Sequence, residues 1–196
     1  MTDEYNPLDY ENLARNCADE LLRHSLGPLP PDGKFTGAGV YALFYRGDFP
    51  AYEPIARSRT PIYVGKAVLS GGRKGGGRIP KPGMQTGTEL YRRLREHAKS
   101  IDQAQNLRLK DFRCRFLVVT PVWITMAERL LIEKYRPVWN VTIEGFGIHD
   151  PGAGRHRGEI SWWDALHPGR PFAARLRQTR DTDDALERLR KHEWTR

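Results

Sequence analysis

The chain has 196 residues and a formal net charge of +8, so it can bury one substantial core but is short for two compact domains. Cys17 and Cys114 are its two cysteines, which argues against a disulfide framework or a cysteine-based zinc site, and we expect both to be reduced and buried. It opens without basic residues or an apolar run, and no stretch reaches the roughly 18 apolar residues of a membrane span, so we expect a cytoplasmic protein without membrane attachment.

The positive charge is concentrated in one part of the chain. Residues 1–30 contain two Arg against six acidic residues, whereas residues 71–99 contain eight Lys or Arg against two Glu. A concentrated basic segment favours a polyanionic partner, most often nucleic acid, because each cation that neutralises a phosphate releases a counterion. A solvated surface that keeps the protein soluble explains the charge alone equally well.

The first predicted element is an amphipathic helix over residues 6–25. Leu13, Cys17 and Leu21 recur at helical spacing beside acidic and amide residues, which predicts packing on the outside of the core or against a second subunit. The glycines and prolines of residues 27–33 end this helix and predict a linker.

Two neighbouring strands follow. Residues 38–46 begin with Gly39-Val40-Tyr41, and residues 62–66 include Tyr63-Val64-Gly65. Both segments have the β-branched and aromatic content of strands, with loop-forming residues between them. An ordinary buried hairpin would need such aromatic residues too, so the pattern alone does not require a functional site.

Residues 68–87 have a composition that cannot form a core element, with seven glycines and several basic side chains. A flexible surface linker would explain this composition. The functional alternative is a loop that orders against a nucleic-acid backbone or groove, where glycine permits close approach. Its basic residues are Arg73, Lys74, Arg78 and Lys81.

Residues 89–101 predict a helix with Thr88 as its N-cap. The apolar residues Leu90, Leu94, Ala98 and Ile101 share one face, and the basic residues Arg92, Arg95 and Lys99 lie opposite. Arg93 and His97 lie against the apolar face, where a guanidinium needs an anionic partner. Either a structural salt bridge or a phosphate would satisfy this need.

The remaining elements are a strand, a buried helix and a C-terminal tail. Residues 112–119 alternate and then become apolar, which predicts a strand, and residues 123–135 predict a largely buried helix. Glu128 and Glu133 both lie at the edges of its apolar arc, so the helical wheel does not decide which of them faces a site. The helix ends before Pro137, and the tail contains a Gly/His/Arg-rich loop and a last amphipathic helix around residues 183–191.

Several segments together resemble the GIY-YIG nuclease superfamily, which cuts nucleic acids with one divalent metal. The resemblance covers about residues 38–141 and lies in five pieces in the right order, which are Gly39-Val40-Tyr41, Tyr63-Val64-Gly65, Arg93 with His97, Ala127-Glu128, and a closing group that ends at Asn140. Within the superfamily the chain is most similar to the type II restriction endonucleases that recognise CCGCGG.

The resemblance implies an α+β fold, with a small three-stranded antiparallel sheet flanked by helices. We expect a single domain, in which residues 38–141 form the nuclease core with the basic loop 68–87. Residues 1–37 then form an N-terminal helix and linker, and residues 142–196 form a C-terminal loop and helical extension.

The resemblance also implies the catalytic residues. Tyr41 and Tyr63 correspond to the motif tyrosines, Arg93 to the motif arginine, and His97 to its partner one turn on; Glu128 corresponds to the metal-binding carboxylate and Asn140 to the final polar residue. The resemblance therefore selects Glu128 over Glu133. Val40 and Val64 replace the isoleucines of the name-giving motifs, and His97 stands where other branches have Tyr.

These residue types suit phosphodiester hydrolysis. We hypothesise that Tyr41 activates or orients the attacking water, that Tyr63, Lys66 and His97 hold water and phosphate, and that Arg93 stabilises the developing charge. A cation near Tyr63 would favour its phenolate, but strand alternation puts Lys66 on the opposite face unless the strand ends or bulges. Glu128 would hold a single Mg²⁺, with Mn²⁺ able to replace it, and no small-molecule cofactor is expected.

The expected partner is double-stranded DNA. Arg is the commonest major-groove partner of guanine, which makes the arginines of residues 68–87 and also Arg155 and Arg157 candidates, although phosphate contact explains them equally well. Symmetric cutting of a palindrome predicts a homodimer. The alternatives are a structure-specific or homing GIY-YIG nuclease, a non-catalytic nucleic-acid-binding module, and an ordinary basic α/β scaffold.

Overall fold

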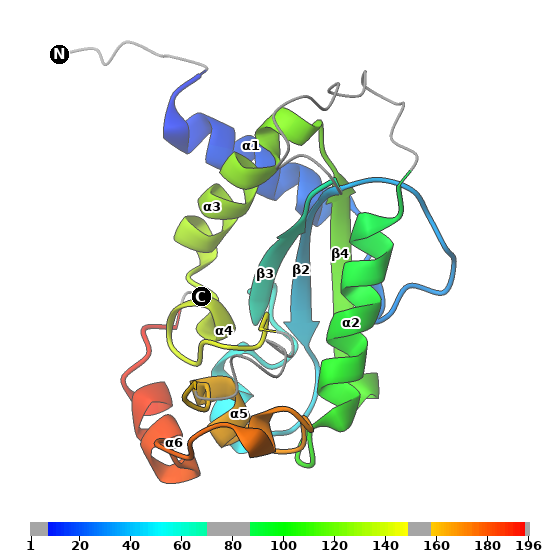
Figure 1. The fold of residues 1–196 in the computed structure, drawn as a ribbon. Helices are drawn as coiled ribbons and strands as arrows, with labels where there is room; N and C mark the ends of the chain where they lie inside the picture. The colour runs from blue at the N-terminus through cyan, green and yellow to red at the C-terminus, as the bar shows by residue number, and fades with distance from the viewer. Residues whose placement is uncertain (1–7, 70–86, 149–157, 195–196) are drawn as a thin grey trace, which may run out of the picture.

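The computed structural model describes residues 8–69, 87–148 and 158–194. These residues form an α+β fold in which helices cover both faces of one antiparallel sheet (Figure 1). The strands are β1 (Gly27–Pro28), β2 (Gly39–Tyr45), β3 (Tyr63–Ala67) and β4 (Phe112–Val118).

The sheet has four strands in the order β1-β4-β2-β3, so the expected three-stranded sheet is wrong by one strand. The additional strand, β1, lies in the segment predicted as a linker, and it pairs Gly27 with Cys114 and Pro28 with Arg113. A two-residue strand made of Gly and Pro has no alternating pattern that the sequence could show. It is recognised as a strand only because it pairs with β4.

The four longer predicted helices are all present, with ends that differ by a few residues. They are α1 (Tyr10–Arg23), α2 (Glu89–Gln103), α3 (Ile124–Tyr135) and α6 (Thr182–Arg190). Two short helices were not predicted, α4 (Val138–Val141) and α5 (Trp162–Leu166), and short 3₁₀ turns occur at Pro50–Ile55, Leu109–Asp111, Pro121–Trp123 and Ala173–Arg175.

Strand β2 is the centre of the fold, because all seven of its residues are buried. Alternation divides its side chains between two apolar clusters. Tyr41 and Leu43 belong to the cluster that includes α2, whereas Val40 and Ala42 belong to the cluster that includes α1 and α3. Each face of the sheet is therefore covered by its own helices.

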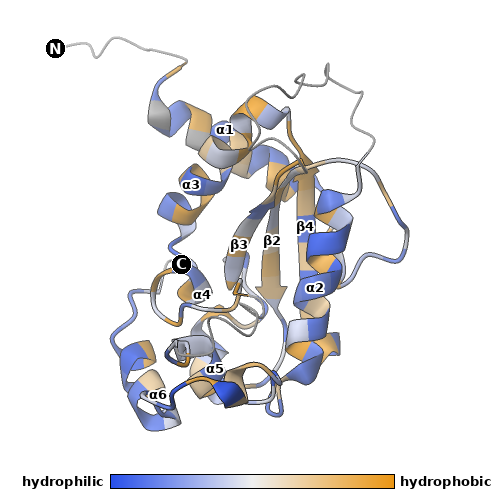
Figure 2. Ribbon diagram, in the orientation of Figure 1, coloured by the Kyte–Doolittle hydropathy of each residue, from blue (hydrophilic) through white to orange (hydrophobic). Residues whose placement is uncertain are grey.

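Helix α2 has the two-sided character that its sequence predicts. Leu90, Leu94, Ala98 and Ile101 are buried, whereas Arg92, Arg95 and Lys99 are exposed, and Figure 2 shows the mostly hydrophilic outer surface of this helix. Thr88 occupies the N-cap position, but its side chain makes no capping hydrogen bond.

The segment after Val141 packs into the same core as the first motif tyrosine. Trp163 and Leu166 of α5 and Leu189 of α6 share one apolar cluster with Tyr41. Figure 1 shows α4, α5 and α6 together beside one end of the sheet. This arrangement brings the C-terminal part of the chain close to the residues of the candidate site.

Both cysteines are free, Cys114 is buried, and Cys17 is only partly buried. The Cys114 thiol lies 3.1 Å from the carbonyl of Pro28, and burial raises its pKa to about 12. Within the described ranges, no helix is long and apolar enough to cross a membrane.

Candidate active site

The two motif tyrosines come from adjacent antiparallel strands. Tyr41 pairs with Gly65 across β2 and β3, and Leu43 pairs with Tyr63. The rings of Tyr41 and Tyr63 lie on the same face of the sheet, with centroids 6.2 Å apart. Tyr41 is 0 % exposed and Tyr63 is 9 % exposed, so the two phenols form the floor of the site rather than its rim.

Gly65 leaves the space that the Tyr41 phenol occupies. A Cβ atom at Gly65 would lie 2.6 Å from Cζ of Tyr41 and 3.0 Å from Cε1 of Tyr63. Real Cβ atoms do not approach another carbon to 2.6 Å, so the Tyr41 phenol would have to move. The glycine of the second motif is therefore needed for the position of the tyrosine of the first.

Helix α2 places His97 and Arg93 over the phenols. His97 is fully buried, and its Nε2 lies 2.5 Å from the Tyr41 hydroxyl. Its ring centroid lies 5.3 Å from both tyrosine rings. Because residues 93 and 97 are one turn apart, the same helix face also directs Arg93 toward this group.

Arg93 is held by the backbone and by its own helix. Nη2 donates to the carbonyl of Gly147 at 2.9 Å, and Nη1 lies 3.3 Å from Oε2 of Glu96. Burial lowers the pKa of the Arg93 guanidinium, but Tyr41, Tyr63 and Glu96 more than offset this, so the pKa is raised overall. The guanidinium stays charged beside the phenols.

Burial is the largest influence on the pKa values of the two phenols. It raises the pKa of Tyr41 well above its ordinary value, with a further increase from Tyr63, and Arg93 lowers it through its charge and a hydrogen bond. Burial also raises the pKa of Tyr63, again opposed by Arg93. The negative charge of Glu128 raises both. Both phenols are therefore protonated in the free protein at neutral pH.

Glu128 and Lys66 form an ion pair on the other side of β3. Oε2 of Glu128 lies 2.6 Å from Nζ of Lys66, and the side chains are 18 % and 31 % exposed. Lys66 follows strand alternation and faces α3, away from the Tyr63 ring, so its charge is directed at Glu128 rather than at a phenol. Glu133 is exposed farther along α3.

Asn140 contacts the backbone of β3. Its Oδ1 accepts from the amide of Val64 at 2.8 Å, and its Nδ2 donates to the carbonyl of Val64 at 2.8 Å. Val64 follows Tyr63 directly, so Asn140 acts on the site through the strand that carries this tyrosine.

The structure adds neighbours that the sequence did not indicate. The ring of Phe146 stacks on His97 at a centroid distance of 4.5 Å and packs edge-on against Tyr63 at 4.9 Å. Gly147 supplies the carbonyl bound by Arg93. The only local signal was the pair of glycines on either side of Phe146, which does not indicate what the segment contacts.

The predicted DNA-binding residues lie outside the described residues. These residues are Arg73, Lys74, Arg78, Lys81, Arg155 and Arg157.

The residues fit a metal ion that keeps most of its water ligands. In the described part of the chain, no group of three or more His, Cys, Asp or Glu side chains could enclose a metal. Glu128 offers one partly exposed carboxylate, whose charge raises the pKa of both phenols, and a hard divalent ion such as Mg²⁺ is commonly bound by one or two carboxylates together with water and substrate oxygens. The donor set suits such an ion and not a closed structural metal site.

Residues 33–192 match the family model described as the Eco29kI GIY-YIG domain. The chain belongs to the Eco29kI GIY-YIG family. A search of curated proteins found no match to the chain. The family is one of restriction enzymes that cut CCGCGG, so this Eco29kI-type chain carries an endonuclease domain whose substrate is DNA.

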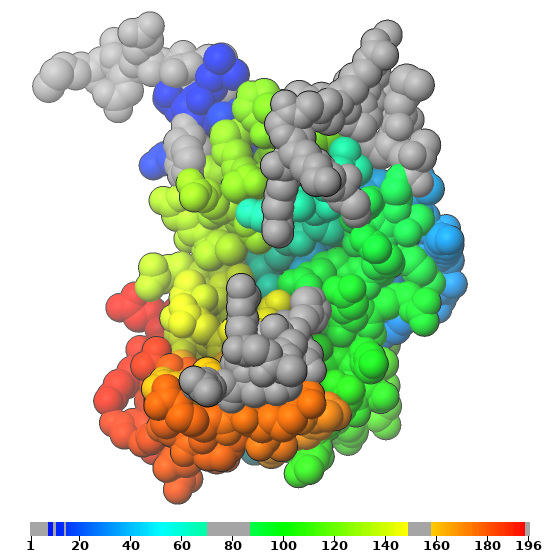
Figure 3. Space-filling model, viewed as in Figure 1, coloured from blue at the N-terminus to red at the C-terminus, as the bar shows by residue number. Residues whose placement is uncertain are grey.

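The elements that carry the predicted catalytic residues lie around one face of the molecule. Figure 3 shows the surface of β3 between α2 on one side and α3 with α4 on the other. The phenols, the guanidinium and the carboxylate of this Eco29kI-type domain therefore come from elements that border β3.

Proposed function

We propose that the protein is a type II restriction endonuclease that hydrolyses both strands of the palindrome CCGCGG, with Mg²⁺ as its metal and a homodimer as its active form. The observation that carries this proposal is the buried hydrogen bond between Tyr41 and His97, beside the Arg93 guanidinium and within the electrostatic reach of Glu128. A hydrogen-bonded tyrosine and histidine, a guanidinium beside them and a carboxylate that acts on them through its charge suit phosphodiester hydrolysis.

Tyr41 and His97 act as a relay for the proton of the attacking water. Burial raises the pKa of Tyr41, so a free phenolate is costly in this environment. In the relay the Tyr41 oxygen takes a proton from water while its own proton passes to Nε2 of His97, 2.5 Å away. The relay requires the His97 tautomer with an unprotonated Nε2, and it avoids a lasting phenolate.

Arg93 binds the phosphate that is attacked. Two of its nitrogens contact Gly147 and Glu96, which fixes the plane of the guanidinium. Its remaining donors and its charge stabilise the negative charge that grows on the phosphate oxygens. Tyr63 donates to the same phosphate or to the water, since its ring lies beside those of Tyr41 and His97.

Glu128 is the residue that would hold the metal. When bound there, the metal supplies charge stabilisation for the leaving oxygen. Lys66, now paired with Glu128, keeps this carboxylate in place in the free protein and contacts phosphate when DNA is bound. Asn140 positions Tyr63 by binding the backbone of Val64.

A dimer follows from the symmetry of the proposed substrate. One set of residues such as Tyr41 and Arg93 can cut one strand at a time, so a palindrome is cut symmetrically in both strands most simply by two sets related by a twofold axis. The GC-only sequence is read by arginines, because guanine offers two acceptors in the major groove. The arginines proposed for this reading lie in residues 68–87 and at positions 155 and 157.

The test is digestion of plasmid DNA with one CCGCGG site, with Mg²⁺, with Mn²⁺, and with EDTA. The proposal predicts one linear product with Mg²⁺ or Mn²⁺ and none with EDTA, and sequencing of its ends gives the cut position. A plasmid in which the site is changed to CCGCGA is the matched substrate control. Intact CCGCGG plasmid, or cutting at flaps and junctions instead, contradicts the proposal.

The dimer is tested separately by analytical ultracentrifugation on a short CCGCGG duplex. We expect two chains on one duplex. A single chain bound to a duplex that is cut in both strands would contradict the homodimer while leaving the recognition sequence in place.

A further inference from the structure

Arg170 is a buried arginine outside the set of residues that the motifs identify. It is 2 % exposed, yet all five of its N–H donors have acceptors. Nε and Nη2 donate to the two oxygens of Asp164, each at 2.7 Å. The guanidinium also lies over the rings of Trp163 and Phe172, at 4.5 and 4.8 Å from their centroids.

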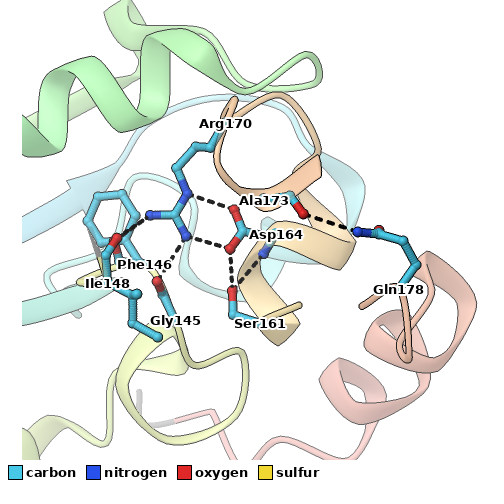
Figure 4. Close-up of polar contacts among 8 residues, drawn as sticks. All are labelled: Gly145, Phe146, Ile148, Ser161, Asp164, Arg170, Ala173 and Gln178. Carbon is cyan, nitrogen blue, oxygen red and sulfur yellow. Dashed lines mark hydrogen bonds and ion pairs between the residues drawn. The ribbon is translucent and has the colours of Figure 1, made fainter. Parts of the chain in front are cut away.

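The other donors of Arg170 bind three carbonyls of one short segment, residues 145–148. Nη2 donates to Gly145 at 3.0 Å, and Nη1 donates to Phe146 at 3.1 Å and to Ile148 at 2.8 Å. Figure 4 shows the guanidinium between these carbonyls and Asp164. Gly145 has φ of +115°, and a Cβ there would collide with Ser161, so the segment turns where only glycine fits.

Arg170 does not bind the carbonyl of Gly147, the fourth residue of this segment, and that carbonyl binds Arg93 of the candidate active site instead. Gly147 lies between Phe146 and Ile148, and its carbonyl accepts from Arg93 at 2.9 Å. The ring of Phe146 stacks on His97. One buried arginine therefore fixes the segment, and the segment in turn contacts the arginine and the histidine of the site.

We infer that Arg170 and Asp164 are positioning residues of the nuclease, which orient Arg93 and His97 through residues 145–148. The inference depends on the proposed roles of Arg93 and His97. Arg170 is 2 % exposed and Asp164 is 1 % exposed, so both would act without touching the substrate. Ser161 completes the arrangement, because its hydroxyl donates to Asp164 at 2.7 Å and so fixes the carboxylate that Arg170 binds.

Lysine cannot replace arginine in this arrangement. A lysine keeps the positive charge beside Asp164, but its donors radiate from one atom and cannot reach three carbonyls and a carboxylate together. Arg170→Lys therefore preserves the buried charge pair while releasing residues 145–148. Truncation would instead leave the Asp164 charge buried and unpaired, which endangers the fold itself.

The matched control is Arg180→Lys. Arg180 lies in the same C-terminal part of the chain, donates to the backbone carbonyl of Ile160 at 2.8 Å, and packs on the Trp162 ring. It contacts none of residues 145–148 in these interactions. The control therefore makes the same arginine-to-lysine change at a residue that binds a backbone carbonyl outside residues 145–148.

The experiment measures single-turnover DNA cleavage at saturating protein and, separately, DNA affinity without metal, each at a fixed interval below the melting temperature of the variant. We expect Arg170→Lys to lower the cleavage rate constant by about 10²-fold, the size of effect that a displacement of about 1 Å produces. Affinity should change by less than about threefold, and Arg180→Lys should cleave at the wild-type rate. A cleavage rate for Arg170→Lys equal to that of Arg180→Lys overturns the inference.

A double-mutant cycle shows whether Arg170 acts through Arg93. If it does, Arg93→Lys/Arg170→Lys cleaves faster than the product of the two single losses predicts, because part of the group that Arg170 positions is already lost. If the two losses multiply in full, Arg170 does not act through Arg93, and that part of the inference is wrong.

Hydrogen exchange tests, without any DNA, whether Arg170 holds residues 145–148 in place. The amide of Ile148 donates to the carbonyl of Gly145 at 3.0 Å, and its exchange should accelerate in Arg170→Lys but not in Arg180→Lys. Unchanged exchange overturns the inference whatever DNA the wild type cuts. A wild type that cuts a sequence other than CCGCGG instead refutes the proposed specificity, and the rate comparison can still be made on that sequence.

Discussion

Tyr41 illustrates how one residue depends on several distant ones. Its hydroxyl is buried and bonded to His97 of α2, its ring passes over Gly65 of β3, and its pKa responds to Arg93. A phenol in water would be a poor base at neutral pH because of its high pKa. Burial makes the phenolate still less favourable, so the role proposed for Tyr41 requires a partner that takes its proton.

Gly65→Ala should disable the site with little effect on the rest of the fold. The added methyl group would meet the Tyr41 ring, and we expect displacement of this phenol to lower the cleavage rate by about 10²-fold or more. Gly27→Ala in β1 is the matched control, because its Cβ would meet nothing within 4 Å. Single-turnover cleavage and thermal melting of both variants provide the comparison. Equal activity in the two would refute the proposed need for a glycine at position 65.

Glu128→Gln should abolish cleavage and preserve DNA binding. The substitution keeps the size of the side chain but removes the charge that would hold the metal, so we expect a loss of more than about 10²-fold. Glu133→Gln, an exposed position on the same helix, should behave as wild type. Cleavage and anisotropy measurements decide between the two carboxylates. Loss of activity in Glu133→Gln with full activity in Glu128→Gln would reverse the assignment.

At the scale of elements, the edge strand β3 carries an unusual share of the site. It supplies Tyr63, Gly65 and Lys66, and in the sheet it pairs with β2 alone. Its outer backbone groups at Val64 bind the Asn140 amide instead of another strand. Helix α4, which begins after Pro137, places this amide there. Asn140 of the short helix α4 thus makes the two hydrogen bonds that a neighbouring strand would otherwise make with Val64.

Asn140→Asp should therefore loosen β3. The carboxylate can still accept from the Val64 amide, but it cannot donate to the Val64 carbonyl and repels it, so we expect a loss of about 1–3 kcal/mol in unfolding free energy. Asn140→Ala should lose both hydrogen bonds. Urea denaturation and hydrogen exchange of residues 63–65 would measure the effect. Wild-type exchange in both variants would show that β3 does not depend on the Asn140 hydrogen bonds.

At the scale of the whole molecule, the C-terminal segment completes the core. His167 is fully buried, with Nε2 2.5 Å from the Tyr52 hydroxyl and Nδ1 2.8 Å from Oδ1 of Asn106. Asn106 donates through Nδ2 to the carbonyl of Leu166, so its Oδ1 is the acceptor and His167 carries its proton on Nδ1. Burial, helped by the charge of Arg170, lowers the pKa of His167 to about 3.

This histidine makes stability depend on pH in a definite direction. Its pKa is about 3 in the folded state and 6.5 in the ordinary state, so below pH 6.5 the unfolded chain binds a proton that the folded chain does not. The contribution of His167 is fully present above pH 6.5, and as pH falls toward 3 it is lost at up to about 1.4 kcal/mol per pH unit.

Urea unfolding between pH 7.5 and 5 measures this dependence in the wild type, in His167→Gln and in His24→Gln, a partly exposed control. We expect the stability difference between the wild type and His167→Gln to narrow as pH falls, and the difference from His24→Gln to stay nearly constant. A constant difference for His167→Gln would mean that this histidine takes up its proton over the same pH range in the folded and unfolded states.

The sequence alone determined the local features of this protein. Strand composition located the two tyrosine segments, helical periodicity placed Arg93 and His97 against the apolar face of α2, and the order of the motifs led to the Eco29kI GIY-YIG family. These features can be read from the sequence because burial of a strand or a helix face repeats at fixed spacing along the chain.

Only the tertiary structure decided how these elements meet. It added β1 to the sheet, paired Glu128 with Lys66 while leaving Glu133 exposed, and joined Arg170 to residues 145–148. Such contacts link residues that are far apart in the sequence and have no periodic spacing. They are set by the register of strands and the packing of helices, which exist only once the whole chain has folded.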